Sequence, residues 1–314
     1  MATNATFAAR RKSLTVAAVA VAAAGCIAGT AIPAQATTGH AGRAATILAA
    51  SLRGANEVPV AGGPAVGDKD GAALEFLKVQ GNKVSVAVAW RHTGKPTSLH
   101  IHQGAKGTNG GVKIDFGKLL DKATGHTVTG TVKVNDTALL KKLTTDPGSF
   151  YANLHTAEFP GGAVRGQLHN VNTAVKFGHA AHSFQASVVR GEQIYECKPA
   201  ADGGYSFTQR DVSALLGGNI RHSFVKPNSG TPQWVAPDGS AVTGALISKT
   251  PNGDGNIPEL DLKATRSGKH HGLLARTPEI LRLNTVGGVA PTGSCAPGTI
   301  VGVPYQADYV FVQR

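Results

Sequence analysis

The chain has 314 residues, which is long enough for two domains with separate hydrophobic cores. Forty glycines, sixteen prolines and few strong helix-forming runs favour short strands with many turns and argue against a helical protein. The formal net charge is +12, but the basic residues are scattered and are not interleaved with aromatic residues, which speaks against nucleic acid as a partner.

Residues 1–36 are predicted to form a secretion signal. Arg10-Arg11-Lys12 precedes an apolar run over residues 14–32, and Ala34-Gln35-Ala36 has the small-x-small pattern that signal peptidase recognises. We expect cleavage after Ala36, which removes three cations and lowers the net charge to +9. The mature chain is therefore expected to be secreted.

Two alternatives concern the same segment. A retained membrane anchor fits less well, because the apolar run is rich in alanine and ends at a good cleavage site, so no stable membrane span is expected after processing. The paired arginines leave the export route open between the general secretory and twin-arginine pathways. Lipidation of Cys26 is a minor alternative, since only half of a lipoprotein box is present.

Beyond the signal, the pattern is that of β-strands. Residues 83–90 alternate, with three valines and Trp90 on one face, and residues 127–134 and 149–156 have a similar pattern. Residues 136–143 are the best candidate for a helix, of one or two turns.

The motif over residues 99–104, LHIHQG, carries the most chemical information. In a strand, side chains at i and i+2 share one face, so His100 and His102 are expected side by side, with Leu99 and Ile101 facing the core. The strand at 149–156 would place His155 on its non-core face in the same way. If these two strands are neighbours, three histidines converge.

Three imidazoles could bind copper or zinc and leave one coordination position open. The corresponding enzyme would be a metal-dependent oxidoreductase, and the His-x-His strand is similar to one in copper/zinc superoxide dismutase, although that family's bridging histidine and aspartate have no counterpart here. In the alternative interpretation the histidines are structural, and Arg165 acts as a clamp that pairs with Glu57 or Glu158.

Three blocks carry a family resemblance: residues 52–59 (LRGANEVP), 99–110 (LHIHQGAKGTNG) and 153–168 (NLHTAEFPGGAVRGQL). Together they resemble the chordin-like (CHRD) domain over residues 44–172, with Val60 replacing the second proline that is usual in that family. The resemblance implies an antiparallel β-sandwich in a secreted protein.

A second all-β domain is predicted over residues 181–314, after a linker near 171–180. Its sequence resembles a family of secreted domains of unknown function, and the resemblance implies no activity. Glu259 and Asp261 alternate along a predicted strand and are expected on a solvent-exposed face. If Cys26 leaves with the signal, Cys197 and Cys295 remain, and an even number of cysteines in an exported chain predicts a disulfide.

The motifs of common hydrolases and nucleotide-binding enzymes are absent from the sequence, including Gly-x-Ser-x-Gly and His-Glu-x-x-His. We therefore predict an exported, non-catalytic two-domain β protein that binds an extracellular or cell-surface polymer or a partner protein. The alternative is a metalloprotein that binds copper or zinc through His100, His102 and His155.

Overall fold

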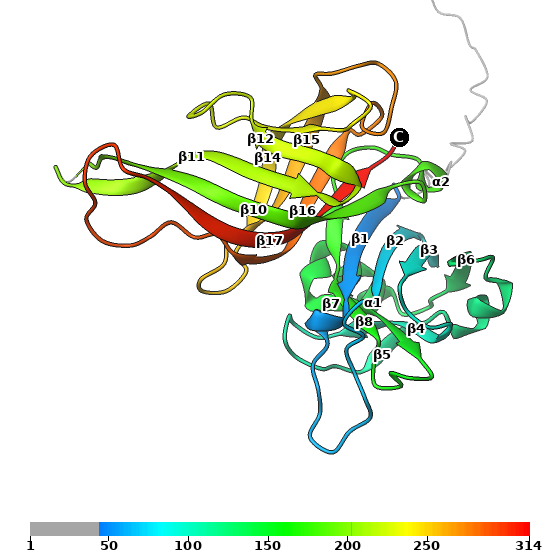
Figure 1. Ribbon diagram of the computed structural model, residues 1–314. Helices are drawn as coiled ribbons and strands as arrows, with labels where there is room; N and C mark the ends of the chain where they lie inside the picture. Colours follow the sequence, from blue (N-terminus) through cyan, green and yellow to red (C-terminus); the bar gives the residue numbers. More distant parts are fainter. Residues whose placement is uncertain (1–43, 202) are drawn as a thin grey trace, which may run out of the picture. The chain divides into compact units, whose positions relative to one another are not determined.

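The chain consists mainly of antiparallel strands. The computed structural model describes residues 44–201 and 203–314, so the predicted signal, its cleavage site and Cys26 lie outside the described residues. The all-β prediction is confirmed: the described residues form one compact unit built from a nine-stranded sheet and a closed barrel (Figure 1).

The first sheet has the strand order β5-β4-β7-β8-β1-β2-β3-β6, with β9 also paired to β1. Its strands are β1 (Thr46–Arg53), β2 (Ala72–Gln80), β3 (Lys83–Arg91), β4 (Pro96–Gln103), β5 (Val112–Asp115), β6 (Thr127–Lys133), β7 (Phe150–Thr156), β8 (Val164–Gln167) and β9 (His169–Val171). Apolar side chains from both ends of this sheet pack in one core, so the layers expected of a sandwich are parts of one continuous curved sheet.

Alternation explains which residues enter this core. Val84, Val86, Val88 and Trp90 of β3 all lie in it, as their two-residue spacing predicts. Helix α1 (Thr137–Thr145) covers part of the same core through Leu140 and Leu143.

The start of α1 is defined by a side-chain cap. The carboxylate of Asp136 accepts a hydrogen bond from the backbone nitrogen of Leu139 at 2.9 Å. This interaction makes aspartate a favourable N-cap residue. The other helical segments are short: α2 (Phe177–Ala180), η1 (Gly54–Asn56), η2 (Gly117–Lys122), η3 (Pro147–Ser149) and η4 (Gly217–Asn219).

The second half of the chain is an eight-stranded barrel in which each strand pairs with the next, and the last pairs with the first. Its strands are β10 (Phe184–Pro199), β11 (Tyr205–Leu216), β12 (Ile220–Phe224), β13 (Pro232–Val235), β14 (Ala241–Thr250), β15 (Glu259–Arg266), β16 (Glu279–Gly287) and β17 (Ile300–Val312). The Cys197–Cys295 disulfide joins the end of β10 to the loop between β16 and β17, which confirms the predicted bond.

Strands β16 and β17 face two cores. Ile280, Tyr309 and Phe311 belong to the core inside the barrel, whereas Leu281 and Val310 pack with residues of β1 and β2 in a separate apolar cluster. Because alternate residues of a strand point to opposite faces, both faces of these two strands are buried and the first sheet packs against the barrel wall.

A charged network crosses the same contact. The Asp308 carboxylate accepts a hydrogen bond from Arg53 Nη2 at 2.6 Å, and Ser51, Ser187 and Asn284 also donate to it. Burial raises the pKa of Asp308, but the hydrogen bonds and charge of Arg53 outweigh that effect and leave the pKa below its ordinary value. The ionised pair therefore holds β1 to the barrel.

The exposed position expected for Glu259 and Asp261 is wrong. Both side chains are buried. Their burial is compensated, since Lys106 and His169 lie within ion-pair distance of Glu259 and Asn172 donates a hydrogen bond to Asp261. These partners come from the other half of the chain, so the alternation within β15 could not reveal them.

Among the described residues, no helix is long and apolar enough to span a membrane.

Candidate metal centre

Two neighbouring strands bring the three histidines together. Strand β4 pairs with β7 so that His100 lies opposite Asn153, while Ser98 lies opposite His155. His155 is thus the diagonal neighbour of His100, at the spacing where long side chains on one face meet. Leu99 and Ile101 occupy the other face and are buried in the core, which fixes the direction of the histidines.

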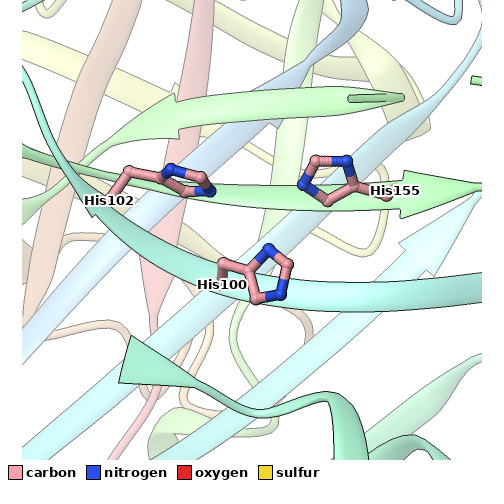
Figure 2. A group of neighbouring side chains, drawn as sticks. All are labelled: His100, His102 and His155. Carbon is pink, nitrogen blue, oxygen red and sulfur yellow. The ribbon is translucent and has the colours of Figure 1, made fainter. Parts of the chain in front are cut away.

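The rings lie close to one another (Figure 2). The centroid of the His100 ring is 5.1 Å from that of His155 and 5.5 Å from that of His102. One ring nitrogen from each residue can be chosen so that all three lie within 4.8 Å of one another. Nitrogens bound to one tetrahedral ion at about 2.0–2.1 Å would lie about 3.3 Å apart, so small side-chain rotations would bring them to one ion.

Backbone carbonyls orient two of the rings. His102 Nδ1 is 2.9 Å from the Gly110 carbonyl oxygen, and His155 Nδ1 is 3.0 Å from that of Pro160. A carbonyl can only accept, so in both rings Nδ1 carries the proton and Nε2 keeps its lone pair. This arrangement, with one nitrogen donating to the protein and the other free, is typical of histidines that bind metals.

The third ring has an acidic neighbour on its other side. His100 Nε2 is 3.6 Å from a carboxylate oxygen of Asp115 on the neighbouring strand β5. The remaining nitrogen of each ring, His100 Nδ1, His102 Nε2 and His155 Nε2, is buried and has no hydrogen-bond partner among the described residues. Three lone-pair nitrogens therefore face one small region with no proton donor for any of them.

The electrostatic surroundings keep the rings neutral. Burial lowers the pKa of His100, His102 and His155 below the ordinary histidine value, and the closeness of the rings to one another lowers the pKa of His100 and His102 further. Neutral imidazole is the form that binds a metal ion.

Arg165 has partners different from those predicted. Its guanidinium donates to the carbonyl oxygens of Ala105 and Thr108 and to the side chain of Asn109, and it stacks on the Tyr151 ring at 3.4 Å from the centroid. Among the described residues no ion pair joins Arg165 to Glu57 or Glu158. Arg165 therefore clamps a loop, which we define as the 104–111 loop, and does so mainly through carbonyl groups.

Of the two predicted acidic partners, Glu57 lies near this cluster and Glu158 is exposed. Burial raises the pKa of Glu57 to about 7, against the opposing effects of the Arg165 charge and a hydrogen bond from Asn153. Glu57 is thus close enough to Arg165 for an electrostatic effect without a direct contact.

The 104–111 loop was not anticipated from the sequence. Gln167 donates to the Gly104 carbonyl at 2.7 Å, and the Tyr151 hydroxyl accepts from the Gly110 nitrogen at 3.1 Å. Since the Gly110 carbonyl also orients His102, these contacts and those of Arg165 position one ring of the cluster. The sequence did carry one signal for the residues that hold this loop. Alternation within β7 and β8 places Tyr151 and Gln167 on the same face as the histidines.

Comparison with known families agrees with the two halves of this structure. Residues 48–168 match the model of the CHRD domain, and residues 208–313 match that of a protein of unknown function (DUF3455). No curated protein and no solved structure is significantly similar to the chain. The histidine cluster lies wholly within the first match. The resemblance seen in the sequence is confirmed: the chain joins a CHRD domain to a domain of the DUF3455 family.

Proposed function

We propose that this chain is an exported binding protein whose CHRD domain holds one copper or zinc ion through His100, His102 and His155. The observation that carries the proposal is the set of three buried imidazole nitrogens without a hydrogen-bond partner among the described residues. Leaving a buried polar atom unpaired costs about 1–3 kcal/mol, and a single metal ion would satisfy all three.

The chemistry of the ligands favours these metals. Imidazole suits copper and zinc, whereas magnesium and calcium prefer oxygen ligands. Three protein ligands would leave a fourth position for water or for a group supplied by a partner. The carbonyls of Gly110 and Pro160 and the carboxylate of Asp115 would act as outer partners of the bound imidazoles.

We propose binding rather than catalysis as the role of this domain. The open position could accept a side chain or carboxylate of an extracellular polymer or protein. Export is supported by the Cys197–Cys295 disulfide, because such bonds persist in oxidising compartments. Redox activity of the superoxide dismutase type is the competing proposal for the same metal.

The test is metal analysis of the exported chain, produced without a histidine tag and titrated with Cu²⁺ and with Zn²⁺. We expect about one equivalent of one of these metals. The triple variant H100A/H102A/H155A should lose it, whereas H270A/H271A, which removes two exposed histidines of the barrel domain, should retain it. Absence of stoichiometric binding, or equal binding by both variants, would refute the proposal.

An assay of the metal-loaded chain separates the two roles. If the site only binds, the metal-loaded chain should turn over superoxide no faster than the same concentration of the metal complexed by the free amino acid histidine. Turnover that disappears in the triple variant would replace binding by catalysis as the function of the site.

A further inference from the structure

We propose that the barrel binds a small amphiphilic carboxylic acid, with its carboxylate at Arg282 and its apolar body in the barrel core. The inference concerns the DUF3455 half alone and does not depend on the metal centre. It rests on a cavity, on a buried cation without an acidic partner, and on the chemistry of the cavity wall.

The cavity lies within the barrel. Its volume is about 560 Å³, and all eight strands, β10 to β17, contribute residues to its wall. Residues of the loops between β12 and β13 and between β14 and β15 also line it, which places it toward the barrel end where those loops lie. Small-molecule sites commonly measure roughly 300–1,000 Å³, and eight-stranded barrels are wide enough for one small ligand.

Arg282 provides a positive charge in this wall. Its side chain follows the inward direction of Ile280 on β16 and is buried. Arg282 Nη2 donates to the Pro258 carbonyl oxygen at 2.8 Å, and another hydrogen bond from Arg282 reaches Tyr309. Among the described residues no carboxylate forms an ion pair with Arg282, and no aspartate or glutamate lines the cavity.

The other titratable groups of the cavity do not balance this charge. Burial lowers the pKa of His222 to about 3, and the Arg282 charge lowers it as well, so His222 is neutral. Burial raises the pKa of Tyr195 and of Tyr309, so both phenols also stay neutral at physiological pH. The buried guanidinium keeps its charge and therefore lacks a counter-ion within the cavity.

Unused hydrogen-bond donors accompany the charge. Arg282 Nε, Trp234 Nε1 and Gln193 Nε2 are buried, belong to residues that line the cavity, and have no hydrogen-bond partner among the described residues. All three are N–H groups that can only donate. An acceptor group with negative charge would satisfy both the donors and the cation, and a carboxylate matches the geometry of a guanidinium.

Much of the remaining wall is apolar. It includes aliphatic and aromatic residues from six strands and one loop: Val212, Phe224, Trp234, Leu246, Ile257, Leu262 and Tyr309. The Trp234 ring is stacked on His222 with centroids 4.4 Å apart, so the aromatic part of the wall is held rigidly. This combination of one cation, several donors and apolar surroundings favours an acid with a hydrocarbon body over a polar anion such as inorganic phosphate.

Titration calorimetry of the full exported chain with sodium decanoate tests the proposal. We expect binding of one decanoate per chain, with a change in the fluorescence of Trp234, observed in a W90F background because Trp90 is the other tryptophan. Decanol, which has the same chain without the charge, should bind at least about tenfold more weakly.

Variants of two barrel arginines locate the carboxylate. R282Q should weaken decanoate binding by at least about tenfold, whereas R221Q, which changes an exposed arginine of β12, should have no effect. If R282Q does not fold, the comparison of decanoate with decanol on the unaltered chain still decides. Absence of decanoate binding, equal affinity for decanol, or equal affinity of R282Q and the unaltered chain would overturn the proposal.

Discussion

The histidine face of the CHRD domain and the cavity of the barrel present opposite chemistry. On the first, three neutral imidazoles offer lone pairs with no donor near them. In the second, a guanidinium and several N–H groups offer protons with no anionic acceptor among the residues of the wall. The first arrangement suits a bound cation, and the second suits a bound anion.

Glu75 shows why the two sites are not simply defects of burial. This glutamate lies in the middle of β2 with 0% of its surface exposed, and neither carboxylate oxygen has a partner among the described residues. Burial raises its pKa to about 8, so it can remain neutral by keeping its proton. Arginine, by contrast, stays protonated in proteins, so burial cannot neutralise Arg282 in this way, and a bound anion would balance its charge.

Removal of the disulfide should have the largest effect on stability, and it should distinguish the barrel, which it destabilises, from the CHRD domain. Cys197 and Cys295 are 98 residues apart in sequence, so the double variant C197A/C295A should lower the free energy of unfolding by about 4–5 kcal/mol on the chain-entropy model. Urea unfolding followed by Trp234 fluorescence in the W90F background measures this. Metal stoichiometry below the transition should not change, and its loss would show that the metal centre depends on the barrel.

Breaking the ion pair at the contact should affect both halves. D308N leaves the Arg53 guanidinium partly buried without its counter-ion, and we expect a loss of about 3 kcal/mol of unfolding free energy. Thermal unfolding of D308N and of R53M/D308N gives the measurement and its control. The double variant should recover part of the loss, because no unpaired charge then remains, and a double variant less stable than D308N would contradict this explanation.

The buried carboxyl of Glu75 predicts a pH dependence. Between about pH 4.5 and 8 the folded chain keeps a proton that the unfolded chain has released, so this group makes the free energy of unfolding fall as pH rises through that window. E75Q, neutral at all pH values, should remove a decline of roughly 3–4 kcal/mol from the free energy of unfolding measured with urea between pH 5 and 8. E158Q, at an exposed site, serves as control, and an unchanged slope in E75Q would disprove the assignment.

The Arg165 clamp should influence the affinity of the proposed metal centre without forming part of it. R165A releases the 104–111 loop, whose Gly110 carbonyl orients His102, and we expect metal affinity to fall by about tenfold. Competition with a chelator measures the affinity. Decanoate binding in the barrel should be unaffected, and a metal affinity equal to that of the unaltered chain would show that the loop does not position the ring.

The sequence was informative where a strand carries its own signal. Alternation assigned His100, His102 and His155 to non-core faces, and the helix predicted at 136–143 is present at 137–145. The partners of these residues were less accessible. Arg165 binds carbonyls of a loop, and a backbone acceptor has no signature in side-chain patterns.

The barrel cavity could not be predicted for a different reason. Its wall draws one or a few residues from each of eight strands, so the nearness of Gln193, Trp234 and Arg282 depends on closure of the sheet. Closure depends on the number and stagger of all the strands of the domain. Local sequence patterns therefore do not predict it. The burial of Glu259 could not be predicted for a similar reason, because its partners Lys106 and His169 come from the other half of the chain.

Anomalous diffraction from crystals of the zinc- or copper-loaded chain is the most direct test of the metal centre. The account predicts one strong peak about 2.0–2.1 Å from His100 Nδ1, His102 Nε2 and His155 Nε2. A loaded crystal with no peak among these three rings, or with metal bound only elsewhere on the chain, would contradict it.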